Sequence, residues 1–79
     1  MKIKIEIVDT NDKRTETIEI APGGAKAKEI IATAGLDAKN KDLTVNGKPI
    51  EPGDLVTQAD VLAAGANPVL RIVARPQGS

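Results

Sequence analysis

The order of patterns along this 79-residue sequence predicts an α+β domain in which a mixed sheet of four to five strands packs on one helix. Strand-like runs at residues 2–7 and 17–20 come first, and a short helical pattern follows at residues 25–34. Two further strand-like runs occupy residues 43–45 and 69–73. This β-β-α-β-β order, in a chain whose length suits a single domain, predicts one folded unit.

The first two runs are predicted to form an antiparallel hairpin. Isoleucine stands at every second position of residues 3–7, with charged residues between, which is the pattern of a half-buried strand. Residues 17–20 alternate in the same way. Between the two runs, residues 9–12 have the sequence Asp-Thr-Asn-Asp, whose side chains favour turns.

The helix is predicted from apolar residues that recur at spacings of three and four. These residues are Ala27, Ile30, Ile31 and Ala34. Gly35 follows directly and is suited to the left-handed residue that ends many helices. Because the pattern covers barely three turns, packing against the sheet must stabilise this helix.

The second half of the chain contains a hairpin signal and a helix start. The Asn-Gly pair at residues 46–47 predicts a tight turn, so residues 48–50 are expected to form a short return strand. Pro49 confines that strand to an edge of the sheet. Thr57, with Asp60 three residues later, predicts a capped second helix of one or two turns.

The core must be built from aliphatic residues, because the sequence contains no Phe, Tyr or Trp. A domain of this size buries only about 60% of its unfolded surface, so the core is expected to be small. The residues predicted to form it are Ile3, Ile5, Ile7, Ile18, Ile20, Ala27, Ile30, Ile31, Leu43, Val45, Leu55, Leu62, Leu70 and Ile72.

Composition argues against several classes of partner. Eleven basic residues balance eleven acidic ones, whereas nucleic-acid binders carry a basic excess and single-strand binders add stacking aromatic residues. The longest apolar run is far below the roughly 18 residues of a membrane span, and residues 2–6 alternate with charges, unlike a signal peptide. We therefore expect a cytoplasmic monomer that binds neither nucleic acid nor membrane.

The absence of His, Cys and Tyr removes most catalytic and metal-binding chemistry. Asp9 and Asp12 could be taken for a carboxylate pair, but Asp is a common turn residue and we interpret both as turn chemistry. The Pro-Gly-Gly-Ala-Lys run at residues 22–26 lacks the spacing of a phosphate-binding loop and is interpreted as a strand-to-helix turn. We expect no catalytic residue, no metal site, no cofactor and no enzymatic activity.

Three segments resemble ubiquitin and its small β-grasp relatives, including the small prokaryotic ubiquitin-like proteins. They are the Met-Lys-Ile start, the Asn-Gly-Lys-Pro-Ile-Glu-Pro-Gly-Asp-Leu run at residues 46–55, and the Val-Leu-Arg-Ile-Val-Ala-Arg run at residues 69–75. The resemblance covers most of the chain and implies a ubiquitin-like β-grasp domain over residues 1–75. It implies little about function, because this fold serves protein modifiers, sulfur carriers and passive interaction domains alike.

The chemistry of that family lies in a C-terminal tail that ends in two glycines. Here residues 76–79 read Pro-Gln-Gly-Ser, so a single Gly78 would have to become terminal by processing, and Pro76 stiffens the approach to it. Arg75 and Gly78 are the candidate tail residues under this hypothesis. Residues 76–79 are expected to form a flexible tail, and the final Gly-Ser at residues 78–79 is typical of a cloning scar.

The resemblance also implies that partners dock on the outward face of the sheet. The candidate residues for such a face are Lys4, Val45, Lys48, Val69, Arg71 and Val73. The alternative is a solvated surface of cross-strand charge pairs. The interpretation we favour is a non-enzymatic protein-interaction module; a modifier or sulfur carrier acting through Gly78, and an engineered fold without a biological role, are the alternatives.

Overall fold

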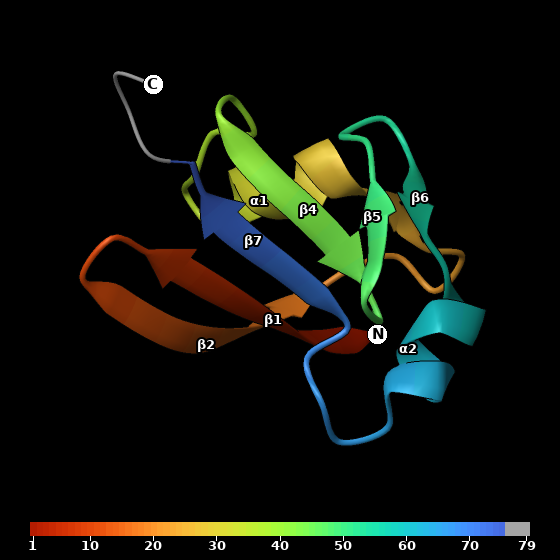
Figure 1. Cartoon of the computed structure of the whole chain (residues 1–79). Coiled ribbons are helices and arrows are strands. Elements are labelled where there is room, and N and C mark those ends of the chain that lie inside the picture. Colours follow the sequence, from red (N-terminus) through yellow and green to blue (C-terminus); the bar gives the residue numbers. More distant parts are fainter. Residues whose placement is uncertain (76–79) are drawn as a thin grey trace.

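The computed structural model describes residues 1–75 and shows a five-stranded sheet beside one main helix (Figure 1). The strand order is β2-β1-β7-β4-β5, with β1 and β7 parallel and the other neighbours antiparallel. The strands are β1 (Lys2–Asp9), β2 (Asp12–Glu19), β4 (Lys41–Val45), β5 (Lys48–Ile50) and β7 (Leu70–Ala74). The predicted α+β architecture with a mixed sheet on one helix is confirmed.

The β1–β2 hairpin is longer than its apolar alternation indicates. β2 begins at Asp12 and pairs along the whole of β1, from Asp9 opposite Asp12 to Lys2 opposite Glu19. The added residues, 12–16, are polar or charged and mostly exposed, because this end of the hairpin extends beyond the core. Residues 12–16 have no fully buried side chain and therefore show no apolar alternation. The alternating pattern for this reason marks only the last part of β2.

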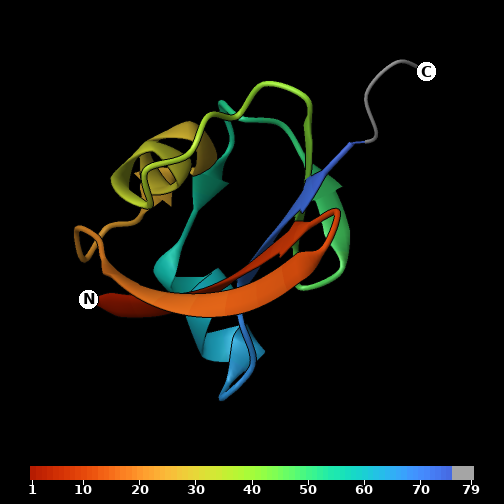
Figure 2. The ribbon, with the colours of Figure 1, turned by 90° about the vertical axis from the view of Figure 1, so that its left-hand side faces the viewer.

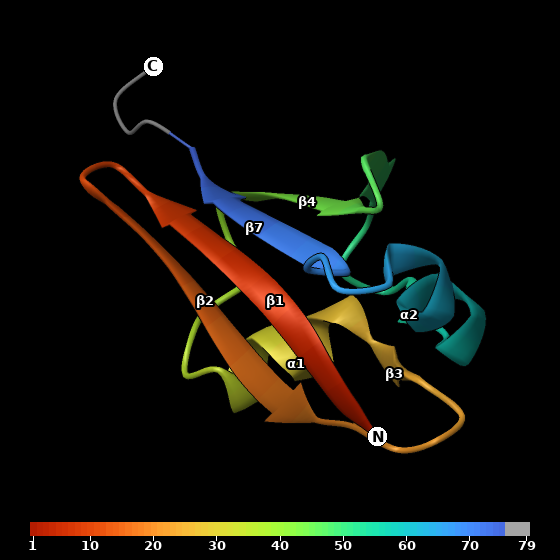
Figure 3. The ribbon, with the colours of Figure 1, turned by 90° about the horizontal axis from the view of Figure 1, so that it is seen from below.

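Helix α1 (Ala27–Thr33) covers one face of the sheet, as the turned views in Figures 2 and 3 show. Its predicted apolar stripe is confirmed, since Ala27, Ile30 and Ile31 are buried. Gly35 has φ +80°, and the backbone N–H of Leu36 donates to the carbonyl of Ile31 at 3.0 Å, so the predicted glycine ending is also present. Neither helix within residues 1–75 has the length and apolarity needed to cross a membrane.

Directly before α1, β3 (Ala25–Lys26) pairs with β6 (Leu55–Val56) in a two-stranded ladder that has no counterpart in the sequence predictions. The pairing continues past β3, because the N–H groups of Ala27 and Lys28 donate to carbonyls of residues 54 and 52, both at 2.9 Å. These bonds satisfy two of the N–H groups that have no partner inside a helix. The ladder therefore fixes where α1 begins.

Helix α2 (Gln58–Ala64) has the predicted capping box. The backbone N–H of Thr57 donates to the carboxylate of Asp60 at 2.9 Å, and the Thr57 hydroxyl accepts from the N–H of Asp60 at 3.3 Å. The side-chain amide of Asn46 donates to the carbonyl of Asp60 at 3.0 Å. This bond connects the β4–β5 turn to α2.

The core confirms most of the predicted residues and corrects two of them. Leu55 and Leu62 are 57% and 73% exposed, so their prediction as core residues was wrong. On β6 the inward position belongs to Val56, which is fully buried, and on α2 it belongs to Val61 and Ala64. The complete buried set is Ile3, Ile5, Ile7, Ile18, Ile20, Ala27, Ile30, Ile31, Leu43, Val45, Val56, Ala64, Val69, Leu70 and Ile72.

The start of the chain is held at the end of β2 by an ion pair. The Met1 ammonium group donates to the carbonyl of Ile20 at 2.6 Å and lies 2.7 Å from a carboxylate oxygen of Glu19. The hydrogen bond that the Met1 ammonium group donates to the Glu19 carboxylate, and then the charge of that group, lower the pKa of Glu19 below its ordinary value, with a smaller contribution from Lys2. Because the pKa is lowered in the folded state, the ionised carboxylate stabilises the fold.

We expect Glu19→Gln to reduce stability at neutral pH and to have no effect in acid. The stabilisation from ionised Glu19 is complete above its ordinary pKa of 4.5 and is lost as pH falls through the lowered pKa. In acid the wild-type carboxyl is protonated, so it is uncharged like the amide of the variant. Urea denaturation at several pH values measures the difference. Glu51→Gln is the control, because this exposed carboxylate has no ion pair within residues 1–75. A pH-independent effect of Glu19→Gln would contradict the assignment.

Candidate functional site

The face of the sheet opposite α1 carries two rows of side chains across neighbouring strands. Alternation along β1 sends its isoleucines into the core and its remaining side chains outward. The strand register then aligns the outward positions. One row is Thr15, Glu6, Arg71, Thr44 and Pro49, and the next row is Lys13, Val8, Val73 and Asp42.

Charged side chains on this outer sheet face pair with one another. A carboxylate oxygen of Glu6 lies 2.8 Å from the Nε of Arg71, and its other oxygen lies 3.7 Å from the Nζ of Lys13. At the end of the sheet, Asp42 accepts a hydrogen bond from the Nε of Arg75 at 2.8 Å. Exposed pairs of this kind contribute roughly 0–1 kcal/mol each, so they organise the surface more than they stabilise the fold.

The apolar part of the outer sheet face is a pair of valines. Val8 of β1 and Val73 of β7 stand directly opposite each other in the parallel register, and both are partly exposed. Lys13 and Asp42 follow at the two ends of the same row. The valine pair therefore lies in the last row of the face, towards the end of the sheet, with charged groups on both sides of it and in the neighbouring row.

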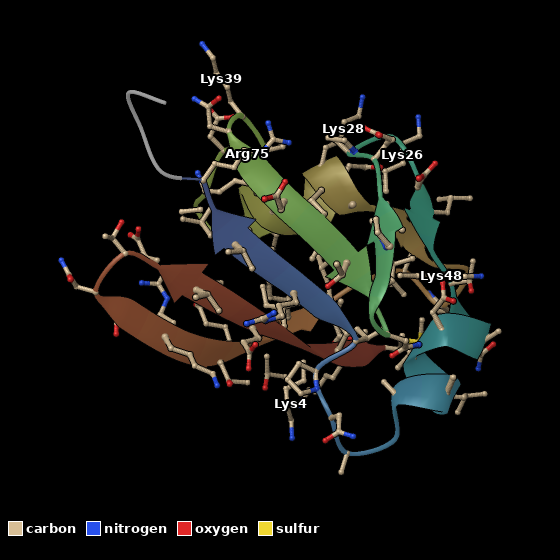
Figure 4. All side chains as sticks on the ribbon, viewed as in Figure 1. Lys4, Lys26, Lys28, Lys39, Lys48 and Arg75 are labelled. Carbon is tan, nitrogen blue, oxygen red and sulfur yellow. The ribbon has the colours of Figure 1, made fainter. Side chains whose placement is uncertain are left out.

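Three of the six residues predicted for a binding face do lie on it. Lys4, Arg71 and Val73 point outward from β1 and β7. Lys4 is also tied to the loop that follows α2, since its Nζ donates to the carbonyl of Ala66 at 3.1 Å. Figure 4 shows Lys4 at the lower side of the sheet and Arg75 near the end of β7.

The predictions for Val45 and Val69 as surface residues were wrong, because both are buried. Val45 pairs with Leu70 and shares its inward direction, while Val69 is buried beside a surface hollow that Val61 and Ala64 of α2 also line. Lys48 is exposed but pairs with Val45, so it stands on the core side of the sheet edge and not on the outer sheet face. Of the two tail residues, Arg75 pairs with Asp42, and Gly78 lies outside the described residues.

Sequence reasoning missed Val8 and the partners supplied by β4. The outward positions of β1 read Lys, Lys, Glu and then Val, so an apolar residue breaks the polar alternation at the point where the pattern was taken to end. Asp42 and Thr44 became part of the face through the β4–β7 register, which no local pattern indicates. The continuing period of two beyond Ile7 was the available signal for Val8.

The part of the chain that the structure describes shows neither a cluster of metal ligands nor an unsatisfied buried polar side chain. No group of three or more acidic residues within residues 1–75 is placed to hold a metal ion. Over the same range, no buried side-chain nitrogen or oxygen lacks a hydrogen-bond partner. Within residues 1–75, the outer sheet face carries three of the ion pairs, those of Glu6 with Lys13 and Arg71 and that of Asp42 with Arg75.

Comparison with solved structures identifies the architecture. The chain is similar to the ubiquitin of Caldiarchaeum subterraneum, with a TM-score of 0.56 and 20% sequence identity over 100% of both chains. It has a ubiquitin-like β-grasp fold. A second ubiquitin-like protein, from the hyperthermophilic archaea Caldiarchaeum subterraneum, matches 96% of this ubiquitin-like domain and 100% of its own chain, at 19% identity and a TM-score of 0.43. No protein-family model and no curated protein matches the sequence.

Proposed function

We propose that this ubiquitin-like domain is a non-enzymatic module, a cytoplasmic monomer that binds another protein through its outer sheet face. The observation that carries the proposal is that α1 covers one face of the five-stranded sheet while the other face is open (Figure 2). The open face presents the Val8–Val73 pair within a frame of ordered charges. An apolar centre with a polar rim is the usual anatomy of a protein interface.

The charged frame supports recognition of a specific partner rather than general stickiness. Arg71 is held by Glu6, and Arg75 is held by Asp42, so both guanidinium groups are oriented before a partner arrives. A pre-ordered side chain loses less conformational freedom on binding. The partner expected here offers a small apolar contact for the valines and polar groups that match the surrounding charges.

The chemistry of the sequence supports a role without catalysis. No His, Cys or Tyr is present in the 79 residues, so acid–base or nucleophilic chemistry would have to rest on Asp, Glu, Lys, Ser or Thr. Most carboxylates within residues 1–75 are exposed, and several serve turns, helix caps or ion pairs. Such carboxylates resemble those of an ordinary solvated surface.

The alternative of a modifier or sulfur carrier acting through Gly78 is tested by mass spectrometry. The exact mass of the protein from its natural source distinguishes the two functions. A terminus at Gly78, a bond to a lysine of another protein, or added sulfur would favour the modifier or carrier. An unmodified chain that ends at Ser79 would favour the interaction module, and the lack of any natural source would favour an engineered fold.

We expect Val73→Glu to weaken partner binding at least about tenfold, because a buried charge at the centre of an interface costs more than 1 kcal/mol. Ala32→Glu is the control, since Ala32 is exposed on α1, away from the sheet face. Partners captured from extract of the source organism are identified, and affinities for both variants are measured by titration. Chemical-shift changes that map to α1, or equal affinities for the two variants, would overturn the proposal.

A further inference from the structure

A hollow lies where the start of β1 meets α2 and the loop between α2 and β7. Its volume is about 220 Å³, which is room for about seven water molecules. An opening of this size admits one residue of a partner rather than a helix or a strand. The residues that line it include Lys2, Lys4, Thr17, Val61, Ala64 and Asn67.

The loop wall of this hollow is fixed by hydrogen bonds to β1. The Nζ of Lys4 donates to the carbonyl of Ala66 at 3.1 Å, and the N–H of Val69 donates to the carbonyl of Lys4 at 2.9 Å. Within the loop, the N–H of Asn67 donates to the carbonyl of Ala64 at 3.0 Å. Figure 4 shows Lys4 beside this loop. Because an ammonium group has three N–H donors, the bond to Ala66 leaves two for a ligand.

Both charged residues in the lining are lysines. Among residues 1–75, no acidic side chain lines the hollow, and neither Lys2 nor Lys4 forms an ion pair. The adjacent carboxylate is that of Glu19, which stands opposite Lys2 in the β1–β2 register. Its close cation is the Met1 ammonium group at 2.7 Å, and Lys2 attracts it more weakly. One negative charge therefore faces three positive charges at this corner of the sheet.

The other carboxylates on the surrounding elements are engaged away from the hollow. A carboxylate oxygen of Glu6 lies 2.8 Å from the Nε of Arg71, and one of Glu16 lies 3.1 Å from the Nε of Arg14. The carboxylate of Asp60 belongs to the capping box of α2, where it accepts from a backbone N–H at 2.9 Å. The two aspartates that close the β1–β2 turn stand at the opposite end of the hairpin. The hollow is therefore a positively charged site that is complementary to an anionic group.

The helix side of the hollow is apolar. Val61 is half-buried and Ala64 is buried, and both belong to the packing of α2 on the core. A free phosphate ion would match the lysines but would leave the exposed part of Val61 uncovered. The C-terminal residue of a protein chain satisfies both sides, because its carboxylate and its side chain are attached to the same carbon atom. Capture of a C-terminal carboxylate is a recurring mode of peptide recognition.

We propose that this hollow binds the C-terminal residue of a partner protein whose last side chain is apolar. The carboxylate pairs with Lys2 and Lys4, and the apolar side chain packs against Val61. The hydroxyl of Thr17 and the side-chain amide of Asn67 line the same opening and supply further hydrogen-bond donors. Because hydrogen bonds already fix the loop wall, little conformational freedom is lost when the ligand enters.

The site is separate from the valine pair on which the proposed function depends. Lys4 and Val8 are four residues apart on β1, a distance of about 13 Å along a strand. The inference therefore goes beyond the proposed function and does not rest on it.

The test follows the amide signals of the isotopically labelled full chain by NMR while an acetyl-Ser-Gly-Ser-Leu peptide with a free C-terminal carboxylate is added. We expect saturable shifts at Lys2, Lys4 and Asn67, with the signals of Val8 and Val73 unchanged. Binding should weaken as salt increases, because exposed charges are screened.

Three matched peptides separate the parts of the ligand without altering the protein. The same peptide with a C-terminal amide lacks the charge, and acetyl-Ser-Gly-Ser-Gly with a free carboxylate lacks the apolar side chain. Acetyl-Ser-Glu-Leu-Ser amide has both groups inside the chain rather than at its end. Each should bind at least about tenfold more weakly, a loss of about 1.4 kcal/mol.

Charge variants locate the site on the protein. The double variant Lys2→Gln/Lys4→Gln should weaken binding of the free-acid leucine peptide at least about tenfold. Lys28→Gln/Lys39→Gln is the matched control, because it removes the same charge from exposed lysines outside the hollow, on the other side of the molecule from Lys4 (Figure 4). Val73→Glu should leave this binding intact, so failure here is distinguishable from failure of the sheet-face function.

Several results would overturn the proposal. These are absence of shifts through the millimolar range, equal binding of the free acid and the amide, equal binding of inorganic phosphate at the same residues, or shifts centred on Val8 and Val73. Concentration-dependent shifts at Lys4 without peptide would show instead that a second copy of the chain occupies the hollow, which contradicts the C-terminus of another protein as the ligand.

Discussion

Gly24→Ala should destabilise the domain by about 3 kcal/mol or more, one of the largest effects expected from adding a single methyl group here. Gly24 has φ +102°, a conformation that residues with a side chain rarely adopt. A Cβ at this position would overlap the backbone carbonyl oxygen of Val56. That oxygen belongs to the β3–β6 ladder, so it cannot move aside as a flexible side chain could.

The consequence of this change reaches α1 through the ladder. If β6 shifts away from residue 24, the bonds that Ala27 and Lys28 donate to the segment before β6 are stretched, and the start of α1 loses its N–H partners. Domains of this size have total stabilities of about 4–12 kcal/mol, so a loss of 3 kcal/mol is a large fraction.

Gly23→Ala is a matched control one residue away. A Cβ on Gly23 would meet no atom within 4 Å, and Gly23 does not have the positive φ of its neighbour. Urea denaturation of both variants measures the free energy of unfolding. Gly23→Ala should change it by less than about 1 kcal/mol. If the two substitutions cost the same, the close approach of residue 24 to β6 is absent from the folded protein.

Local signals explain which elements could be predicted from the sequence. The β1 alternation, the α1 spacing, the Asn-Gly turn and the Thr57–Asp60 capping box each involve residues within a few positions of one another. Each is present in the structure because local geometry and burial favour the same conformation there. The order of these elements was sufficient for the ubiquitin-like fold.

The features that could not be predicted depend on pairing between distant segments. β3 and β6 have two residues each, too few for any period to show, so nothing local indicates that Val56 rather than Leu55 faces inward. Val69 precedes the first residue of β7 and is buried next to the buried Leu70, which alternation along the strand cannot reveal. For the same reason the predicted residues of the outer sheet face needed correction. The residues that make up this face are set by the register of β1, β7 and β4, which no local pattern shows.

Leu70→Ala should lower stability by about 3–5 kcal/mol, enough to leave much of the protein unfolded. Leu70 is fully buried, and it pairs with Ile5 on one side and with Val45 on the other. Removing its side chain leaves a cavity at the centre of the sheet, between β1 and β4. Thermal unfolding should show a decrease in Tm of more than about 10 °C, given 4–8 °C per kcal/mol for a domain of this size.

Leu62→Ala is the matched control, because it makes the same chemical change at a residue of α2 that is 73% exposed. Apart from the effect of helix propensity, it should lower the free energy of unfolding by less than about 0.5 kcal/mol. Leu70→Val is the milder test if the alanine variant does not fold, with a smaller decrease in Tm of the same sign. The sequence predicts both leucines as core residues, and the structure separates them by the direction of α2. Equal losses from the two alanine variants would mean that Leu62 faces the core. In that case α2 would have a different orientation, and the hydrogen bond from Asn46 to the Asp60 carbonyl would not form as described.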